Sequence, residues 1–503
     1  MPNSQKCSKT RGGGEGFDVV IGKTPYVSHV PIFCKDYLKY KKDSISTFCG
    51  FFILFYELSE KIMRKGGVLS LITSNSFLKA EYGRNIREYL CKHTTILEVI
   101  NIENTQIFSD ATVNTVILSL QKDKLDKEAL IVSSCFKGND FMKYINDNKF
   151  YYSQNIFSSN SWGLQNMKNI NIINKIKDDN KTLEHYSTKI RLGIATGDNN
   201  VFVINDEQRS DFIKKNEYNK NIIKPILRGR DIERYYYNSE NLFLLLTKNG
   251  VDVKSEYPDI YEYLDSFGDK FKKRGAKGEH WSNLRACSFF DDFKLEKIVW
   301  IELSDRGRFT IVTDEIYLLN SAYFLLSPKE FNSKFLLSLL NSKLIEFYLK
   351  HIANTSGAGT LRWINNYVKD FPIPEIPLTE QQPFIDKADT MLALNGELQS
   401  LLAKFGRMLC REFGLDKLSK RLGAWHTLDF DDFIKELDKE LKKHKQKLTL
   451  SQKAEWEDYF VKEQAHAHAL QQQINTTDDT LNAMVYALYG LGDDEIALIE
   501  QGQ

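Results

Sequence analysis

A run of seven residues near the middle of the chain combines cations with glycine. It reads Lys272-Lys273-Arg274-Gly275-Ala276-Lys277-Gly278. Backbone phosphates of nucleic acids attract such charges, and the gain in binding depends on the salt concentration. We therefore predict that Lys272, Lys273, Arg274 and Lys277 contact a polyanion. A solvated charged face is an equally good interpretation of any one of these residues.

A second basic cluster, Arg228, Arg230 and Arg234, is followed by three tyrosines at positions 235–237. Arg can hydrogen-bond the edge of guanine through two donors, and aromatic rings can stack on bases. We predict that Arg228 and Arg230 contact DNA. Contacts to phosphates position a protein on DNA, and contacts to bases specify the sequence. The residue types alone therefore do not assign an individual Arg to a base.

A loop of four residues, Lys23-Thr24-Pro25-Tyr26, is the third candidate for chemistry. It follows the apolar run 17–22, which is short, ends in Gly and predicts a buried strand. Open α/β sheets bind their ligands at the carboxyl ends of strands, where this loop lies. A strand followed by an accidental Pro-Tyr turn is the alternative interpretation.

The elements around these candidates can be predicted from apolar periodicity. They are a helix over 46–64, a buried strand over 68–73, a short helix over 85–92, and strands over 96–100 and 113–120. Strands that alternate with helices predict an α/β sheet covered on both faces. Residues 123–185, rich in Lys, Asp and Asn, predict a poorly defined connector. Short strands, Gly turns and aromatic clusters over 186–377 predict a mixed α+β domain, and residues 378–503 predict a helical region.

The composition sets outer limits on these interpretations. The net charge is only +1 over 503 residues, so nucleic-acid binding must come from local patches. Seven scattered Cys without a CxxC pair argue against disulfides and zinc, and favour a reducing, cytoplasmic setting. His466 and His468 are expected to be solvated, with no metal. The polar, Gly-rich residues 1–16 do not form a signal peptide, and the apolar run 48–55 is too short to span a bilayer.

The loop after residues 17–22 resembles the strand-to-loop motif of amino-methyltransferases, usually written Asn-Pro-Pro-Tyr. In that family the Asn oxygen and a loop carbonyl hold the hydrogens of the target amino group, and the Tyr stacks on the flipped adenine. Pro25 and Tyr26 match the last two positions, whereas Lys23 and Thr24 stand at the first two. A Lys ammonium has donors and no acceptor, so its polarity is opposite to that of the Asn oxygen.

Three further phrases follow in the order that this family shows. They are Gly66-Gly67, a strand and Thr73-Ser74-Asn75-Ser76-Phe77; then Tyr82-Gly83-x-x-Ile86-Arg87-x-x-Leu90; then Phe108-Ser109-Asp110-Ala111-Thr112-Val113-Asn114-Thr115. The chain is similar to the adenine-specific methylases of type IIG restriction-modification enzymes. The resemblance implies that residues 1–122 are the C-terminal half of a Rossmann-like methyltransferase domain, with residues 23–26 as its catalytic loop.

The resemblance also implies S-adenosyl-L-methionine as methyl donor. The family binds it through a Gly-rich turn after the first strand and an acidic residue after the second, both before the catalytic loop. Gly12-Gly13-Gly14-Glu15-Gly16 lacks the strand and helix that such a turn needs. We therefore expect a catalytic domain that is cut short, with donor binding supplied by a partner chain or by a lost N-terminal half.

Three phrases within residues 186–377 resemble the target-recognition domain of the same enzymes. They begin at Thr188-Lys189-Ile190-Arg191-Leu192-Gly193, at Lys224-Pro225-Ile226-Leu227-Arg228-Gly229-Arg230-Asp231-Ile232, and at Asn354-Thr355-Ser356-Gly357-Ala358-Gly359-Thr360-Leu361-Arg362-Trp363. The resemblance implies that this domain binds double-stranded DNA. Residues 481–496 resemble a recurrent ending of the group, an amphipathic helix capped by Gly490 and followed by an acidic helix start at Asp493.

Two hypotheses remain open at this point. In the first, the chain belongs to a site-specific adenine methyltransferase of a restriction-modification system. In the second, the chain is a DNA-binding specificity module or gene remnant without catalysis. Lys23 and the missing donor turn favour the second, and the order of the family phrases favours the first.

Overall fold

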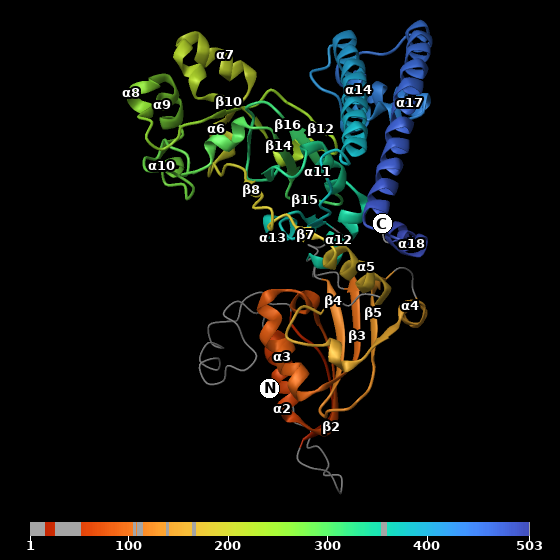
Figure 1. The fold of residues 1–503 in the computed structure, drawn as a ribbon. Coiled ribbons are helices and arrows are strands. Elements are labelled where there is room, and N and C mark those ends of the chain that lie inside the picture. Colours follow the sequence, from red (N-terminus) through yellow and green to blue (C-terminus); the bar gives the residue numbers. More distant parts are fainter. Residues whose placement is uncertain are drawn as a thin grey trace. The chain divides into compact units, whose positions relative to one another are not determined.

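The computed structural model describes residues 16–25, 52–103, 107, 114–136, 140–162, 167–353 and 360–501. The chain divides into two units, one of Met1–Asn174 with Leu349–Arg362 and one of Lys175–Tyr348 with Trp363–Gln503. Figure 1 shows both units, coloured along the sequence from the N-terminus (red) to the C-terminus (blue). Among the helices in the described ranges, none combines the length and apolar character needed to cross a membrane.

The first unit is built on a mixed sheet of six strands in the order β1-β2-β4-β3-β5-β6. The strands are β1 (Phe17–Lys23), β2 (Met63–Ser74), β3 (Thr95–Glu103), β4 (Thr115–Gln121), β5 (Ala129–Cys135) and β6 (Phe150–Tyr152). β1 runs parallel to β2 and β3 runs parallel to β5, whereas β4 is antiparallel to both β2 and β3. The strands β1, β2, β3 and β5 therefore all end at the same side of the sheet.

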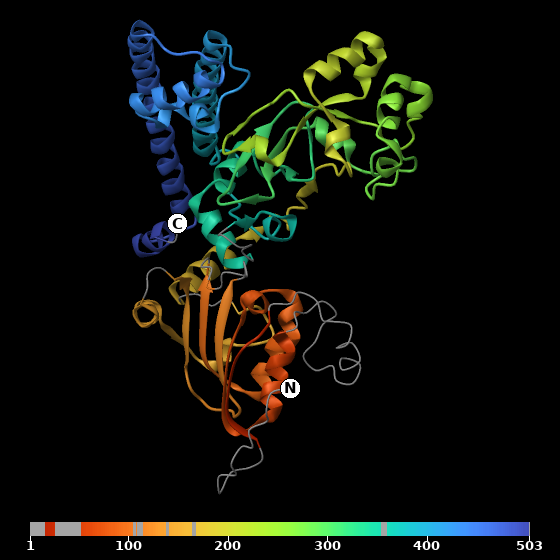
Figure 2. The ribbon, with the colours of Figure 1, turned by 180° about the vertical axis from the view of Figure 1, so that it is seen from behind.

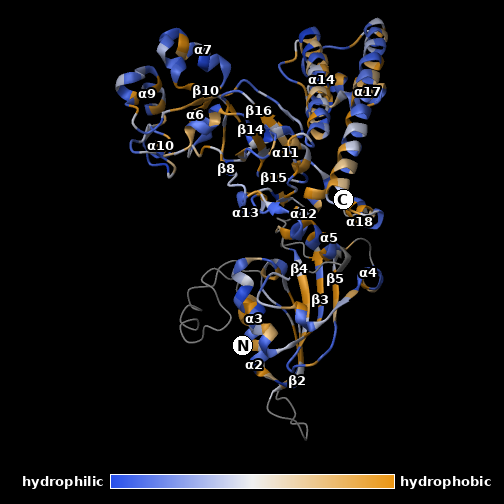
Figure 3. Ribbon diagram, in the orientation of Figure 1, coloured by the Kyte–Doolittle hydropathy of each residue, from blue (hydrophilic) through white to orange (hydrophobic). Residues whose placement is uncertain are grey.

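Helices cover both faces of this sheet, as the alternation of elements predicts. α2 (Phe52–Ile62) and α3 (Arg84–His93) bury Phe52, Tyr56 and Ile86 against the strands. Figure 2 gives the view of the same layers from behind. On the opposite face Tyr144 of α4 (Phe141–Asn148) packs on Ile100 of β3. The central strands β3, β4 and β5 are apolar along much of their length (Figure 3), which a sheet with two covered faces requires.

The prediction of a buried strand over residues 17–22 is half right. The strand forms, but among the described residues it lies at the edge of the sheet with β2 as its one partner. Phe17, Val19 and Ile21 remain 51%, 56% and 78% exposed, while Val20 on the other face packs on the core. Apolar residues predict a strand, and its position in the sheet decides whether both faces are covered.

The sheet also extends into residues 123–185, for which a poorly defined connector was expected. β5 and β6 lie in this segment and extend the sheet beyond β3. The run Ala129–Val132 is apolar and buried at three of its four positions. The Lys, Asp and Asn residues on either side dominate the composition of this segment. The composition therefore did not predict so short an apolar strand.

The second unit contains two four-stranded sheets. The first has the order β16-β14-β18-β8 and the second β17-β10-β13-β9. The strands are β8 (Lys189–Leu192), β9 (Val203–Ile204), β10 (Ile223–Leu227), β13 (Phe243–Leu245), β14 (Lys297–Ile301), β16 (Phe309–Val312), β17 (Tyr317–Leu318) and β18 (Ala322–Leu326). Val299 and Phe324 of the first sheet and Leu227 and Leu244 of the second bury their side chains in one common core.

Short helices and a hairpin complete this part of the second unit. The helices are α6 (Asn199–Phe202), α7 (Asp206–Lys215), α8 (Val253–Glu256), α9 (Pro258–Asp265), α10 (Gly268–Lys272), α11 (Ser333–Leu340) and α13 (Asn365–Val368). α12 (Lys343–Ile352) begins in this unit and ends in the first. The hairpin joins β11 (Ile232–Glu233) to β12 (Tyr236–Tyr237). Strands and helices of this mixture are the α+β arrangement expected for this part of the chain.

The C-terminal part of the second unit is helical, as predicted. It consists of α14 (Gln382–Phe413), α15 (Lys420–Gly423), α16 (Phe430–Lys443), α17 (Leu450–Leu488) and α18 (Asp493–Gln501). The long helices α14 and α17 pack along each other (Figures 1 and 2). Gly490 adopts a left-handed φ of 63° after α17, which confirms the predicted cap before the acidic start of α18.

Candidate functional site

The loop predicted to be catalytic leaves the sheet at the carboxyl end of β1. Lys23 is the last residue of the strand and is exposed. Thr24 is 1% exposed, and its backbone N–H donates to the carbonyl of Ile72 over 3.3 Å. The Thr24 hydroxyl has no hydrogen-bond partner among the described residues. Pro25 is exposed, and Tyr26 lies outside the described residues.

A chain of amides and hydroxyls crosses the same ends of the neighbouring strands. Asn75, just after β2, donates through Nδ2 to Oδ1 of Asn101 on β3 over 2.9 Å. Asn101 donates in turn to Oγ of Ser133 on β5, also over 2.9 Å. The Ser74 and Ser76 hydroxyls lie 2.9 Å apart. Such groups can both donate to and accept from a nucleobase or its amino group.

These polar residues were not singled out as functional from the sequence. Asn101 interrupts the apolar run Ile100-Asn101-Ile102, and a buried Asn in a strand is the signal that could have identified it. Buried polar side chains need partners, and Asn101 is 3% exposed with partners on two other segments.

The segment after β2 is held in place by a buried cation. Arg87 is 1% exposed and donates to the carbonyls of Phe77, Ala80 and Ser159 over 2.5, 2.8 and 3.1 Å. Its burial lowers the pKa of the guanidinium. A Cβ at Gly83 would lie 2.2 Å from the Phe77 carbonyl oxygen. The Tyr82-Gly83…Arg87 phrase therefore shapes the turn that follows β2.

A cradle for a methyl donor needs a glycine turn between the carboxyl end of a strand and a helix. Among the described glycines of this unit, Gly22 lies inside β1 and Gly66 and Gly67 lie in the first half of β2. Gly83 lies between β2 and α3, where a Cβ would meet the Phe77 carbonyl. Among the described residues no cluster of His, Cys, Asp or Glu suits a metal ion.

In the second unit, the basic loop 272–278 separates into buried and exposed cations. Arg274 is 8% exposed and donates to the carbonyls of Thr196, Trp281 and Asn283 over 3.0, 2.5 and 2.8 Å. Burial lowers its pKa to about 10. This gives Arg274 a structural role in place of the predicted phosphate contact, because its donors are occupied inside the fold.

The three lysines of the loop also differ from one another. Lys272 pairs with Asp265 over 2.6 Å, which raises its pKa, and its Nζ lies 4.9 Å from the Trp281 ring centre. Lys273 is exposed and has no carboxylate partner among the described residues. Lys277 is exposed, with one long contact to the Lys272 carbonyl. Lys273 and Lys277 are thus the cations of this loop that face solvent.

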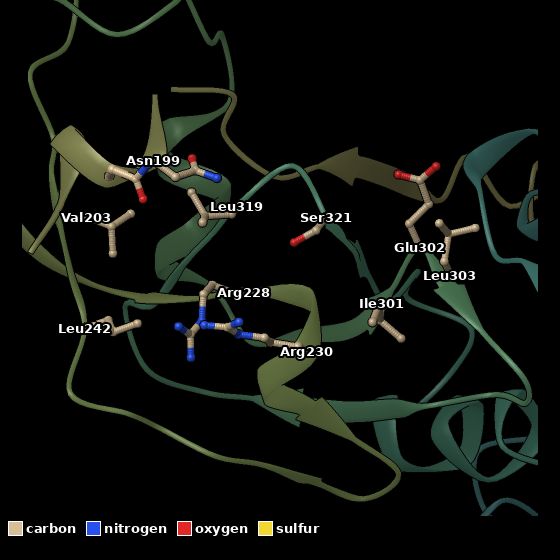
Figure 4. A pocket seen from close by; sticks show the side chains of 11 residues that line it. Asn199, Val203, Arg228, Arg230, Leu242, Ile301, Glu302, Leu303, Leu319 and Ser321 are labelled. Carbon is tan, nitrogen blue, oxygen red and sulfur yellow. The ribbon is translucent and has the colours of Figure 1, made fainter. Parts of the chain in front are cut away.

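Arg228 and Arg230 line one pocket of about 670 Å³ (Figure 4). Its other lining residues are Asn199, Asn200, Val203, Leu242, Ile301, Glu302, Leu303, Leu319 and Ser321. Arg228 is bound to Asp231 over 2.7 Å and to Glu240 over 2.5 Å, and the hydrogen bond to Asp231 raises its pKa most. Arg230 is exposed and has no such partner in the described parts of the chain.

The glycine between these two arginines is required by a close approach. A Cβ at Gly229 would lie 2.4 Å from the carbonyl oxygen of Ser321. The Ser321 hydroxyl accepts from the Gly229 N–H over 2.9 Å. The phrase Arg228-Gly229-Arg230-Asp231 is therefore a tight turn that holds one arginine by ion pairs and leaves the next one exposed.

Two further arginines, Arg362 and Arg234, do not line the pocket of Figure 4. Arg362 is exposed in β19 (Leu361–Arg362), and the preceding residues 354–359 lie outside the described residues. Arg234 is turned inward and bound to Asp478 of α17 over 2.7 and 2.5 Å, and to the Asn341 carbonyl over 2.6 Å. Arg234 is therefore unavailable to a ligand.

Three sequence families match parts of the chain. Residues 2–108 match the Eco57I restriction-modification methylase family, and residues 224–373 match the TaqI-like C-terminal specificity domain. Residues 377–485 match a domain of unknown function (DUF8810). The first match covers β1, β2 and the polar residues at their ends, and the second contains Arg228, Arg230 and the loop 272–278.

The names of curated relatives describe them as type II methyltransferases. The type II methyltransferase M.BstVI of Geobacillus stearothermophilus is 20% identical over 386 residues, which are 71% of this chain and 67% of that protein. The type II restriction enzyme and methyltransferase RM.Eco57I of Escherichia coli is 24% identical over 283 residues, 49% of this chain and 28% of that protein. The chain thus spans about two thirds of the first relative and less than a third of the second.

A solved structure shares the fold over most of the chain. The type IIL restriction-modification enzyme MmeI, in a complex with DNA, matches with a TM-score of 0.54 at 12% identity. The match covers 95% of this chain and 55% of that one. The chain carries a segment of an Eco57I-type restriction-modification methylase followed by a TaqI-like specificity domain, and it is homologous to the type II methyltransferases of restriction-modification systems.

Proposed function

We propose that the chain acts in the sequence-specific methylation of an adenine amino group in double-stranded DNA, with S-adenosyl-L-methionine as donor. The observation that carries the proposal is the loop 23–25 at the carboxyl end of β1, beside the Asn75–Asn101–Ser133 chain. Open α/β sheets place their ligands at this side. In this proposal the second unit selects the DNA site, and the first holds the base.

The chemistry requires acceptors for the hydrogens of the adenine amino group, because its nitrogen must become nucleophilic. The Thr24 hydroxyl is buried and without a hydrogen-bond partner in the described residues, so its oxygen can take such a hydrogen. We assign the loop backbone near Pro25 as a second acceptor and Tyr26 as the stacking residue. The Lys23 ammonium offers hydrogen-bond donors and no acceptor. Its positive charge repels the positively charged S-adenosyl-L-methionine.

In the proposal, the site that binds the donor lies outside the described residues, either in the same polypeptide or in a partner chain. The residues of this chain orient the base and accept hydrogen bonds from its amino group.

DNA binding in the proposal rests on exposed cations: Arg230, Lys273 and Lys277 of the second unit and Arg362 of the first. Lys272 and Arg228, which are held in ion pairs, lie beside Lys273 and Arg230 in the sequence. Arg230 is exposed and lines a pocket, so in the proposal it contacts a base edge, whereas the lysines contact phosphates.

The second candidate function is sequence-specific DNA binding without methyl transfer. Lys23 at the position of an acceptor is the observation that favours it, because an ammonium cannot hold the amino hydrogens. Under this alternative the second unit works as described above and the loop of the first unit is inert.

Transfer of radiolabelled methyl groups to DNA separates the two candidates. The purified chain and its Lys23→Asn variant are compared with the same DNA and donor, and DNA binding of both proteins is measured in parallel. Methyl transfer by the chain, or its appearance in Lys23→Asn, supports the first proposal. Binding of S-adenosyl-L-methionine is measured as well, because absence of transfer separates the two candidates only when the donor is bound. Binding of DNA and of the donor by both proteins with no transfer by either supports the second, and no DNA binding at low salt refutes both.

A further inference from the structure

A polar groove of about 440 Å³ lies in the second unit between the hairpin β11–β12 and the helices α14 and α17. Its lining includes Arg230 and Arg306, the hairpin residues 233–236, and residues 391–399 and 471–478 at intervals along the two helices. Arg230 also lines the pocket of Figure 4, so one side chain borders both cavities. The helices belong to the part of the chain that matches a domain of unknown function.

The acidic groups around this groove are neutralised by ion pairs within the protein. Asp478 is bound by Arg234 over 2.5 Å, Glu233 by Arg308 over 3.0 Å and Asp231 by Arg228 over 2.7 Å. Arg306 and Arg230 are exposed, and neither has a carboxylate partner in the part of the chain that the structure describes. Arg228 and Arg308 are each shared with a second carboxylate, Glu240 and Asp305, so the charges around the groove are mixed. Arg306 and Arg230 are the exposed cations of its lining.

The helices face this groove with uncharged amides. Asn395 and Gln399 lie one turn apart on α14, and Gln471 and Asn475 lie one turn apart on α17. Gln471 donates to Oδ1 of Asn475 over 2.9 Å, which aligns the two side chains along the groove. Amide N–H groups donate to phosphate oxygens, and their carbonyls accept from base or sugar groups.

A buried tie holds α17 beside the hairpin. Arg234 sits in the turn of the hairpin, reaches Asp478 with two hydrogen bonds and stacks on Tyr235, whose φ is 60°. A residue other than Gly in this conformation carries strain that the surrounding contacts must offset. The tie therefore fixes the width of the groove before any ligand binds.

We propose that α14 and α17 form a second DNA-contacting surface, the second wall, next to the pocket that Arg230 lines. On this surface Gln471, Asn475 and Gln399 contact the sugar-phosphate backbone of the duplex, while Arg230 contacts a base. This inference rests on the proposed DNA binding of the second unit. Arg230 joins the groove to the pocket of Figure 4, and Arg230 and Arg306 are exposed cations without a carboxylate partner among the described residues. Together with amides that match the sugar-phosphate backbone, these features favour double-stranded DNA as the occupant.

The test uses the full chain and a fluorescently labelled duplex of mixed sequence, titrated by anisotropy at low salt. Gln471→Glu places a negative charge in the groove, and Gln473→Glu places the same charge on the same helix at an exposed position outside the groove lining. We expect Gln471→Glu to weaken binding by about 5- to 10-fold at 50 mM salt and by less at 200 mM, because salt screens the repulsion. Gln473→Glu should bind like the parent chain.

Arg306→Gln provides a second variant that does not depend on the helices folding normally. It should weaken binding and reduce the slope of log K against log[salt] by about 1. If Gln471→Glu and Arg306→Gln bind as the parent does while Arg230→Ala binds less tightly, the second wall is refuted and the proposed DNA site stands. If the parent chain itself shows no binding at low salt, the proposed function fails and the second wall fails with it.

Discussion

Neighbouring charged residues of this chain have different surroundings, and their roles follow from those surroundings. Arg274 and Lys273 are adjacent, yet Arg274 is buried with three carbonyl partners and Lys273 is exposed. Arg87 and Lys297 are buried in the same way, each with three backbone carbonyls as acceptors. Cations of this kind stabilise turns, and only the exposed ones are available to DNA.

Substitution of Arg274 and Lys273 should therefore affect different measurements. Arg274→Ala leaves three carbonyls without their donor, and we expect it to reduce the free energy of unfolding by about 3 kcal/mol. Lys273→Ala should change that free energy by less than about 0.5 kcal/mol but should weaken DNA binding several-fold. Urea denaturation and DNA titration of both variants check this pair; a destabilised Lys273→Ala would contradict the assignment.

Lys297 should make stability depend on pH in the alkaline range. It is 1% exposed, and burial lowers the pKa of its ammonium from 10.5 to about 8. Below about pH 8 the folded and unfolded chains both bind the proton. Between about pH 8 and 10.5 the folded chain has lost it and the unfolded chain retains it, so this group contributes increasing stability as the pH rises.

The comparison is made with Lys297→Met, which keeps the length of the side chain and removes the titrating group. The variant should be less stable than the parent at pH 7, because the carbonyls of Phe293, Leu295 and Asp314 lose their donor. The difference in the free energy of unfolding should widen from pH 8 to pH 10. A difference that stays constant over this interval would show that the amine keeps its ordinary pKa.

At the scale of elements, close backbone contacts explain the glycines of the family phrases. Gly83 lies at the start of α3 against the Phe77 carbonyl, and Gly229 lies in the turn after β10 against the Ser321 carbonyl. Neither position has a left-handed φ, so backbone freedom is not the reason for glycine. The turn at Gly83 sets the shape of the loop after β2. The turn at Gly229 sets the position of Arg230.

Gly83→Ala should destabilise the first unit, because its Cβ would meet backbone atoms at 2.2 and 2.9 Å. We expect a loss of about 2 kcal/mol or more in the free energy of unfolding, typical of overpacking against backbone. Gly396→Ala is the matched control: this glycine lies inside α14 and nothing lies within 4 Å of its would-be Cβ. The control should gain about 1 kcal/mol from helix propensity. Denaturant unfolding of the two variants measures the expected loss in the free energy of unfolding for Gly83→Ala and the expected gain for Gly396→Ala.

The tie between the hairpin and α17 is an element-scale contact that can be measured as a coupling energy. Arg234→Ala and Asp478→Ala each remove one partner of a largely buried pair, and each should cost about 3 kcal/mol. Because both variants lose the same interaction, the double variant should cost clearly less than the sum. Additive effects in the double-mutant cycle would show that the two side chains stabilise the fold independently.

At the scale of the whole molecule, DNA affinity must arise from a few cations, since the net charge is +1. The candidates are Arg230, Lys273, Lys277, Arg306 and Arg362. Each phosphate neutralised contributes about 0.9 to the slope of log K against log[salt], so the five set an upper slope of about 4 to 5. Titrations at several salt concentrations measure the slope; a much steeper value would mean that other cations take part.

The fold of the whole molecule could be predicted from the sequence in part. The strands over 68–73, 96–100 and 113–120 and the helix over 85–92 were confirmed as β2, β3, β4 and α3, because their apolar periodicity is local. The strands β5 and β6 were missed, and β1 was taken as buried although it is an edge strand. Composition reports on a segment, whereas membership of a sheet depends on partners from distant parts of the chain.

The sequence by itself determined the order of the family phrases, the class of fold and the residue types that could contact DNA, because these depend on neighbouring positions along the chain. Only the tertiary structure decided that Arg274 and Arg234 are buried while Arg230 and Lys273 face solvent. It alone brought Asn101 to Asn75 and Ser133, and Arg230 to the side of α17. Burial and proximity are set by contacts between segments far apart in the sequence, so charge and spacing could name these residues but could not assign their roles.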